Sequence, residues 1–327
     1  MSLRLRLTKE EKKEYTVDVA IVGTGPAGIA AGIYCARYML STVLIGDVLG
    51  GQVSKANIVE NYLGFASIKA SELIDRFTSH LSRYNIPIIN DRVDNAVRKD
   101  NGDLELTTRK GYKIRSSALI IATGAKDKEL GVPGEKEFVG RGVSYCSTCD
   151  AAFFYGANNV VVVGGGDTAF ESAYLLTQYA KKVTLVHRRS EFRAQPILVQ
   201  RVRETGKVEF VLNAVVKEIY GDEKVKGIIV QNVVTGETTN IPAEGVFINI
   251  GYEPENELAK KLGVNLDEKG YIVVSPYMET NIDGVFAAGD VTNLWVNFKQ
   301  IITSAAQGAV AAYSAYRYIM NKKKIDN

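Results

Sequence analysis

Two cysteines, Cys146 and Cys149, are separated by two residues in the stretch "SYCSTCDAAF", and Asp150 follows them directly. A CxxC pair occurs in proteins as half of a zinc site, as a structural disulfide or as a redox couple. Zinc needs about four ligands. The other sulfur and imidazole groups in the chain are Cys35, His80 and His187. These residues offer few candidate ligands to complete a zinc site, and three cysteines in 327 residues do not form a disulfide framework. The sequence therefore favours a redox couple and predicts no metal site.

Length and composition limit the class of protein. A chain of 327 residues predicts about two domains, and a content of 46% hydrophobic and 24% charged residues is ordinary for a globular protein. The 40 basic and 37 acidic side chains leave a net charge of +3, which gives no bulk basicity for binding nucleic acid. The start "MSLRLRLTKEEKKEY" has no continuous apolar segment, and no apolar run reaches the roughly eighteen residues of a membrane span. We expect a soluble cytoplasmic protein, in which a CxxC is more often catalytic or metal-binding than structural.

Two segments of the chain share one pattern of an apolar strand, a glycine turn, a helix of small residues and a second strand. They read "VDVAIVGTGPAGIAAGIYCARYMLSTVLIGD" and "NNVVVVGGGDTAFESAYLLTQYAKKVTLVHRR", with glycine motifs that start at Gly23 and Gly164. A lone GxGxxG motif is weak evidence for a dinucleotide site. Here each copy lies between a predicted strand and a predicted helix, which is the context in which the motif binds a dinucleotide. The second glycine lets the backbone approach a pyrophosphate, and the third position, Gly28 or Ala169, lets helix and strand pack closely. The phosphates then lie at the positive end of the helix, so the repeat predicts two bound dinucleotides.

The two copies differ where they would recognise the ribose. After its second strand the second copy carries four potential cations, which are His187, Arg188, Arg189 and Arg193. An acid at this place suits NAD or FAD, whereas cations suit the 2′-phosphate of NADPH. The first copy has Gly46 there, and Asp47 one residue later. Asp47 fits a ribose contact or a surface turn equally well, so the residues alone do not identify the first dinucleotide.

Eight motifs then occur in the order found in the low-molecular-weight thioredoxin reductases, which the chain resembles from about Val17 to its C-terminal helix. They are "GTGPAG", "GGQ" with "VEN", "ATGA", "CSTCD", "GGGDTA", "HRRSEFRA", "GVFAAGD" and "QIITSAAQGA". The resemblance implies an α/β fold with two Rossmann-like dinucleotide-binding domains of the three-layer ββα type. Residues 1–124 and 251–327 would form the FAD domain, and residues 125–250 an inserted NADPH domain that carries the CxxC. It also implies a homodimer that reduces thioredoxin or a related small disulfide protein.

The resemblance also implies the site residues. FAD would be held by Gly23, Gly25, Pro26, Ala27, Gly28, Gly51, Gln52, Asn61, Ala125, Asp290, Lys299, Gln300 and Ile301. NADPH would be held by Gly165, Gly166, Thr168, Ala169, His187, Arg188, Arg189 and Arg193. Cys149 would face the flavin, Cys146 would attack the partner's disulfide, and Asp150 would handle protons. An acid beside a CxxC also fits a helix cap, and this alternative stays open.

The chain departs from the family pattern in three places. Ala151 stands where glycine is common, and Lys299 replaces an arginine near the flavin. The segment around Trp295 has no family counterpart whose role carries over. Two other enzymes fit the same motifs, an NAD(P)H oxidase and a reductase of a glutaredoxin-like protein, because acceptor choice depends on surface shape. A non-catalytic nucleotide sensor is disfavoured by the intact CxxCD. Cys35, among small apolar residues of a predicted helix, is expected to be a buried hydrophobe without function, and His80 receives no role.

Overall fold

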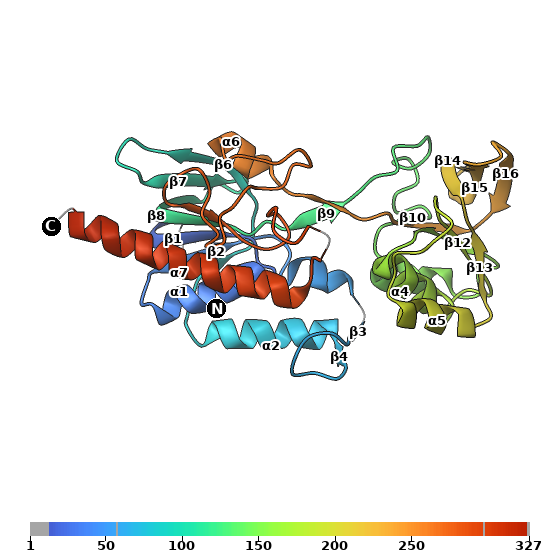
Figure 1. Cartoon of the computed structure of the whole chain (residues 1–327), viewed down its shortest axis with the longest axis horizontal. Coiled ribbons are helices and arrows are strands. Elements are labelled where there is room, and N and C mark those ends of the chain that lie inside the picture. Colours follow the sequence, from blue (N-terminus) through green and yellow to red (C-terminus); the bar gives the residue numbers. More distant parts are fainter. Residues whose placement is uncertain (1–12, 57, 297, 326–327) are drawn as a thin grey trace, which may run out of the picture. The chain divides into compact units, whose positions relative to one another are not determined.

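The structure is a computed structural model that describes residues 13–56, 58–296 and 298–325 (Figure 1). The chain divides into two units. The first unit contains the residues up to Ala125 together with those from Pro254 onward, and the second unit is Lys126–Glu253. The two connections between them pair as short strands, β9 (Ala125–Asp127) and β18 (Tyr252–Pro254).

The first unit is built on a sheet in which one long strand has three neighbours. The sheet contains β1 (Glu14–Val22), β2 (Thr42–Ile45), β5 (Ile88–Ile89), β6 (Val93–Arg98), β7 (Leu104–Thr108), β8 (Lys113–Ile121) and β19 (Val285–Ala287). Along one edge β8 pairs in parallel with β1. Strand β1 in turn pairs in parallel with β2, and β2 pairs in parallel with β5. Along its other edge the first half of β8 pairs antiparallel with β7, and the second half pairs parallel with β19. The carboxyl ends of β1, β8 and β19 therefore meet at one edge.

Helices cover the parallel part of this sheet. They are α1 (Pro26–Arg37), α2 (Ala70–Ser82) and α7 (Ile301–Ile325), which Figure 1 shows together on one side of the sheet. Small residues allow α1 and α7 to pack closely, and a Cβ added to Gly308 would lie 2.0 Å from the carbonyl oxygen of Ala27. Shorter elements complete the unit: η1 (Gly51–Lys55), β3 (Ile58–Val59), β4 (Ile68–Lys69) and α6 (Glu257–Leu262). The loop that contains Asp290 leads from β19 to the first turn of α7.

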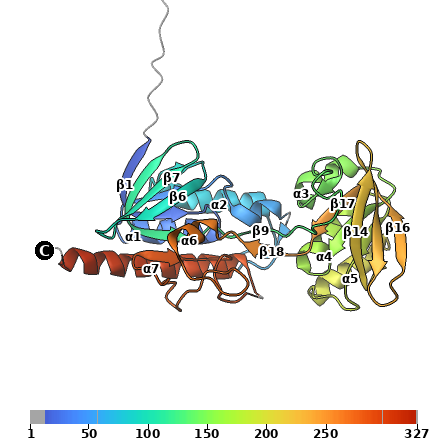
Figure 2. The ribbon, with the colours of Figure 1, turned by 90° about the horizontal axis from the view of Figure 1, so that it is seen from above.

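The second unit has three layers. Its parallel sheet has the order β10 (Val143–Ser144), β17 (Gly245–Asn249), β11 (Val160–Gly164), β12 (Val183–Val186) and β13 (Val208–Val211). An antiparallel sheet of β14 (Ala214–Gly221), β15 (Val225–Asn232) and β16 (Thr238–Pro242) covers one face. The helical segments are α3 (Ser147–Asp150), η2 (Ala151–Phe154), α4 (Asp167–Leu176) and α5 (Pro196–Glu204). In Figure 2, α4 and α5 lie on the opposite side of this unit from β14 and β16.

The alternation of side chains along β11 produces this layering. Val160 and Val162 are buried in the core under α4, whereas Val161 and Val163 are buried in the core shared with the antiparallel sheet. Successive residues of a strand point to opposite faces, so a strand buried on both sides is a continuous apolar run. Strand β11 is such a run, "VVVVG".

The predicted repeat is confirmed as β1–α1–β2 in the first unit and β11–α4–β12 in the second. Each pair of strands is parallel, with Val19 opposite Thr42 in one unit and Val160 opposite Val183 in the other. The α/β class with Rossmann-like units is likewise observed. Among the described residues, no helix combines the length and the apolar character needed to cross a membrane.

Candidate active site and dinucleotide sites

Cys146 and Cys149 form a disulfide at the start of α3, with their Cα atoms 5.3 Å apart. Cys146 is the N-cap of α3, and its Sγ accepts a hydrogen bond of 3.2 Å from the backbone N–H of Cys149. Cys149 is exposed and Cys146 is half-buried. A disulfide on one exposed helical turn is accessible to an incoming thiol, so this arrangement can carry out thiol–disulfide exchange.

Cys35 is free and fully buried in α1. Burial raises the pKa of its thiol to about 12, so it stays protonated at neutral pH. Since the thiolate is the reactive form, Cys35 is inert. Burial therefore distinguishes the accessible pair, Cys146 and Cys149, from the unreactive thiol of Cys35.

Asp150 ends α3 and is half-buried. It occupies the N-cap position of η2, yet among the described residues its side chain makes no capping hydrogen bond there. The capping alternative thus has no support in the side-chain contacts. Asp150 directly follows Cys149 in the chain, at the end of the same helical turn.

The first glycine turn brings several backbone segments together. Gly23 has φ of +122°, and a Cβ there would lie 2.0 Å from the carbonyl oxygen of Ala122 at the end of β8. Gly25 is the N-cap of α1 without a side-chain cap, and Pro26 occupies the first turn, where its missing N–H costs nothing. A Cβ on Gly51 would lie 3.2 Å from the Cα of Gly25. The N–H groups of this first turn lack intrahelical acceptors and face a cradle lined by backbone.

Other residues predicted to hold FAD lie around this cradle or in contact with one another. Gln52 donates through Nε2 to the carbonyl oxygen of Ala125, while its Oε1 is buried without a protein partner among the described residues. Asn61 donates to Oε1 of Gln300 at 3.1 Å, and Ile301 begins α7. The orphaned oxygen of Gln52 and the bare cradle both fit a bound dinucleotide, because a buried acceptor needs a donor.

Asp290 lies in the loop between β19 and α7, next to the first turn of α1. A Cβ on its neighbour Gly289 would lie 2.9 Å from Cβ of Ala27. Asp290 accepts a hydrogen bond of 2.7 Å from Oγ of Ser304. Burial raises the pKa of the Asp290 carboxyl, although the Ser304 hydroxyl and the Lys299 charge act in the opposite direction. The group is a half-buried acceptor at the edge of the cradle.

Lys299, predicted as a flavin contact, donates hydrogen bonds to backbone carbonyl oxygens of its own loop. Its Nζ donates to the carbonyl oxygens of Thr292 at 2.7 Å and Leu294 at 2.9 Å, and it lies 5.0 Å from the ring centre of Tyr271. Asp47 is likewise engaged, because Nε of Arg92 donates to it at 2.6 Å.

At the second glycine turn, a side chain occupies the space beside one glycine and leaves the space beside the next one open. A Cβ on Gly165 would lie 2.3 Å from the ring of His187, whereas nothing lies within 4 Å of a Cβ on Gly166. Gly166 is the N-cap of α4, again without a side-chain cap, and Thr168 and Ala169 follow in its first turn. Asn249, at the end of the neighbouring β17, has a buried Oδ1 without a protein partner among the described residues. Backbone can therefore approach a ligand closely at Gly166 but not at Gly165.

His187 packs against the glycine turn and contacts the loop that follows β12. It is buried, and its Nε2 is 3.1 Å from the carbonyl oxygen of Glu191. Burial lowers the pKa of the imidazole, as do the nearby arginine charges, so the ring is neutral at pH 7. The cations of this loop are therefore Arg188, Arg189 and Arg193, all exposed. The backbone N–H of Arg193 donates to the carbonyl oxygen of Gly165 at 2.8 Å, which fixes the loop beside the turn.

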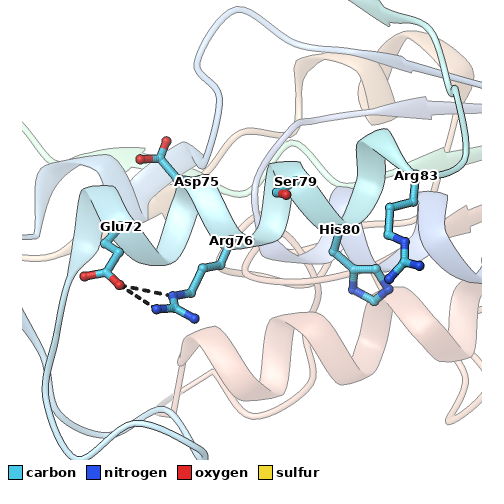
Figure 3. Close-up of a pocket in the computed structure, with 6 residues that line it drawn as sticks. All are labelled: Glu72, Asp75, Arg76, Ser79, His80 and Arg83. Atoms are coloured by element: carbon cyan, nitrogen blue, oxygen red, sulfur yellow. Dashed lines mark hydrogen bonds and ion pairs between the residues drawn. The ribbon is translucent and has the colours of Figure 1, made fainter.

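A separate hollow of about 520 Å³ lies on α2 (Figure 3). Its lining is Glu72, Asp75, Arg76, Ser79, His80 and Arg83. Figure 3 shows that all six project from one helix, with Glu72 and Arg76 joined as an ion pair of 2.7 Å. Spacings of three and four residues give one charged stripe along the helix surface, which contains no thiol or glycine turn. Among the described residues, no three side chains of metal-ligating type come together.

Comparison with known proteins identifies the family. The model of the pyridine nucleotide-disulphide oxidoreductases matches residues 17–310. The thioredoxin reductase of Bacillus subtilis (strain 168) is 42% identical over 311 residues, which cover 94% of this chain and 96% of that protein. The crystal structure of Lactococcus lactis thioredoxin reductase in its FR conformation is 38% identical, with a TM-score of 0.89 over 93% of this chain and 99% of that one.

A third similarity is the crystal structure of T. acidophilum thioredoxin reductase, 39% identical, with a TM-score of 0.87 over 92% of this chain and 98% of that one. The range matched by the family model contains both glycine turns, the CxxC and the start of α7. The chain therefore belongs to the thioredoxin reductases, flavoprotein enzymes of the pyridine nucleotide-disulphide oxidoreductase family.

Proposed function

We propose that this chain is an NADPH-dependent thioredoxin-disulfide reductase that uses FAD and the Cys146–Cys149 pair. The observation that supports it most directly is an exposed disulfide in the same unit as a glycine turn flanked by arginines. When bound, NADPH supplies hydride and FAD relays its two electrons, the number that a dithiol/disulfide couple carries. The second unit would be the NADPH domain and the first unit the FAD domain.

FAD would be held by the first glycine turn and the residues around it. The N–H groups at the start of α1 suit the pyrophosphate, since helix N-termini favour anions. The orphaned Oε1 of Gln52 and the half-buried carboxyl of Asp290 would accept hydrogen bonds from the cofactor. Gly51, Asn61, Ala125 and Gln300 would complete the contacts, and Lys299 and Ile301 would border them.

NADPH would be held by the second glycine turn, with its pyrophosphate against Gly166, Thr168 and Ala169. Arg188, Arg189 and Arg193 would bind the 2′-phosphate, because a guanidinium pairs well with a phosphate. His187 would act indirectly, by packing on Gly165 and holding the loop through the carbonyl oxygen of Glu191.

The cysteines would perform two exchanges once the pair is reduced. The thiolate of Cys146 attacks the acceptor's disulfide, forming a mixed disulfide and expelling one acceptor thiolate. The thiolate of Cys149 then attacks Sγ of Cys146, which restores the intramolecular disulfide and expels the second acceptor thiolate. Asp150 would donate a proton to a leaving thiolate, since it ends the same helical turn.

The test is NADPH oxidation by the full chain with and without an oxidised thioredoxin. We expect oxidation that depends on thioredoxin, and loss of that dependence in Cys146→Ser and in Cys149→Ser. Both variants should still let NADPH bleach the flavin, because this step precedes thiol chemistry. Turnover without thioredoxin but with oxygen would indicate the oxidase instead, and turnover with only a glutaredoxin-like acceptor would indicate the other reductase.

A homodimer is part of the proposal, and a patch of tyrosine, methionine and arginine side chains on α7 and on α1 and the residues that follow it supports this. Tyr34, Met39 and Tyr313 are 42%, 90% and 39% exposed. Arg317 lies over the ring of Tyr313, and Tyr38 stacks on Tyr316 with ring centres 4.7 Å apart. Tyrosine, methionine and arginine are enriched at protein interfaces. Sedimentation should give a dimer, and a Tyr34→Glu, Tyr313→Glu double variant should give a monomer if this patch is the interface.

The proposed location is the cytoplasm, where glutathione and thioredoxin systems keep protein thiols reduced. An exposed redox disulfide that must be reduced in every cycle suits that compartment. Fractionation of cells that produce the chain checks this, and recovery in an extracytoplasmic fraction would contradict it.

A further inference from the structure

Glu135 is a buried carboxyl group in the second unit that the exchange steps do not use. It is 1% exposed. Its Oε1 accepts hydrogen bonds from the backbone N–H of Leu130 at 2.7 Å and from the hydroxyl of Tyr145 at 2.8 Å. Its Oε2 accepts a third, of 2.6 Å, from the backbone N–H of Gly131. All three partners are donors, so this place requires a side chain with two acceptor oxygens.

Tyr145 connects this carboxyl group to the redox pair, because it is the residue directly before Cys146. Burial, and after it the hydrogen bond to Glu135, raise the pKa of the Tyr145 hydroxyl, which therefore remains a donor at neutral pH. Tyr145 also packs against the apolar core between the two sheets. Its side chain is thus held at the ring and at the hydroxyl, and this fixes the backbone on the N-terminal side of Cys146.

The orientation of Cys146 matters because its sulfur is the acceptor of a specific N–H group. Sγ lies 3.2 Å from the backbone nitrogen of Cys149. In the reduced pair, a hydrogen bond from that N–H group to the Cys146 thiolate favours the charged form. A change in the backbone at Tyr145 would turn Cys146 and weaken this contact.

We propose that Glu135 and Tyr145 are positioning residues that hold Cys146 where its thiolate accepts the hydrogen bond from the N–H of Cys149. This inference rests on the proposed redox role of the pair. The same carboxyl group fixes Leu130 and Gly131, a few residues from the start of the second unit at Lys126. One buried group therefore orders both the nucleophile and the chain that enters this unit.

The experiment measures thiol chemistry without coenzyme or acceptor, so it is independent of reductase activity. The full chain with Cys149→Ser keeps the N–H group at position 149 and has one reactive thiol, since Cys35 is buried. The rate at which iodoacetamide alkylates Cys146 is followed from pH 5 to 10 by mass spectrometry. Tyr145→Phe and Glu135→Gln are then added singly and together. Tyr220→Phe is the matched control, because it removes a hydroxyl that donates to Asn240 at 2.6 Å elsewhere in the unit.

Tyr145→Phe should raise the thiol pKa of Cys146 and slow alkylation at pH 7 by about threefold or more, since the thiolate fraction falls about tenfold per pKa unit. Glu135→Gln should act in the same direction, because its amide NH₂ would face an N–H donor. The double variant should match the stronger single one, since both act through one contact. A Tyr145→Phe profile equal to that of Tyr220→Phe would overturn the proposal, as would additive effects. Tyr145→Phe removes one oxygen atom, so it remains decisive even if Glu135→Gln does not fold.

Discussion

Removal of Arg188 and Arg189 tests how the second unit selects its coenzyme. The loop that carries them is fixed by contacts that do not involve their side chains. These are the bond from the Arg193 N–H to Gly165 and the contact of His187 with the Glu191 carbonyl oxygen. Replacing both arginines by alanine should therefore leave the loop folded and remove only positive charge.

The size of the effect follows from the exposure of the two side chains. A hydrogen bond between charged groups contributes about 1.5 to 3 kcal/mol, but exposed pairs are screened by water and contribute less. About 1.4 kcal/mol for each arginine corresponds to tenfold in affinity, or roughly a hundredfold for the double variant. NADH lacks the 2′-phosphate, so its KM should change by less than about threefold on the same reasoning.

The assay is the KM for each coenzyme in the thioredoxin-coupled reaction, repeated at two salt concentrations. The wild-type KM for NADPH should rise with salt, and that of the double variant should rise less, because screening acts on the charges that were removed. Lys217→Ala with Lys224→Ala is the matched control, since it removes two exposed cations from the same unit. Equal losses for NADPH and NADH would refute the assignment, and so would an equal loss in the lysine control.

Two further predictions concern the cofactor cradles. Gly166→Ala should leave the melting temperature unchanged, because nothing lies within 4 Å of its Cβ, yet weaken NADPH binding by about tenfold or more by blocking the pyrophosphate. Calorimetric unfolding and coenzyme titration check this, and a lowered melting temperature with normal binding would contradict it. Asp290→Asn should stabilise the FAD-free chain at neutral pH, since a carboxyl whose pKa is raised by burial loses its contribution to stability as pH rises through that pKa. The same variant should bind FAD more weakly, and thermal melts across pH would refute the reasoning if the variant were less stable than the wild type at neutral pH.

The sequence predicts those parts of the fold that depend on local pattern. Both second strands of the repeat, Thr42–Ile45 and Val183–Val186, lie where the apolar runs indicate. These runs are buried on both faces and follow a helix of small residues, so their signal is strong. Only two residues separate the disulfide partners, and their pairing needs no knowledge of the tertiary fold.

The parts that could not be predicted depend on contacts between distant or irregular segments. Glu135 and Tyr145 lie in chain without regular periodicity, and no local pattern distinguishes this buried glutamate from its exposed neighbour Glu137. Lys299 is similar, because the path of its loop, rather than a local pattern, sets which carbonyl oxygens lie near its ammonium group. It donates to Thr292 and Leu294, and its flavin contact stays a prediction.

The two copies of the repeat differ in the charges that follow their second strand. In the first unit Asp47 pairs with Arg92, which also lies 3.4 Å from Glu255, so one cation meets two carboxylates there. In the second unit His187 is neutral, and three exposed arginines surround the corresponding position. A 2′-phosphate is repelled by the first arrangement and attracted by the second, because the glycine turns themselves recognise only the pyrophosphate. One backbone design can therefore hold two different dinucleotides in a single chain, since coenzyme choice depends on side chains about twenty residues beyond the shared turn.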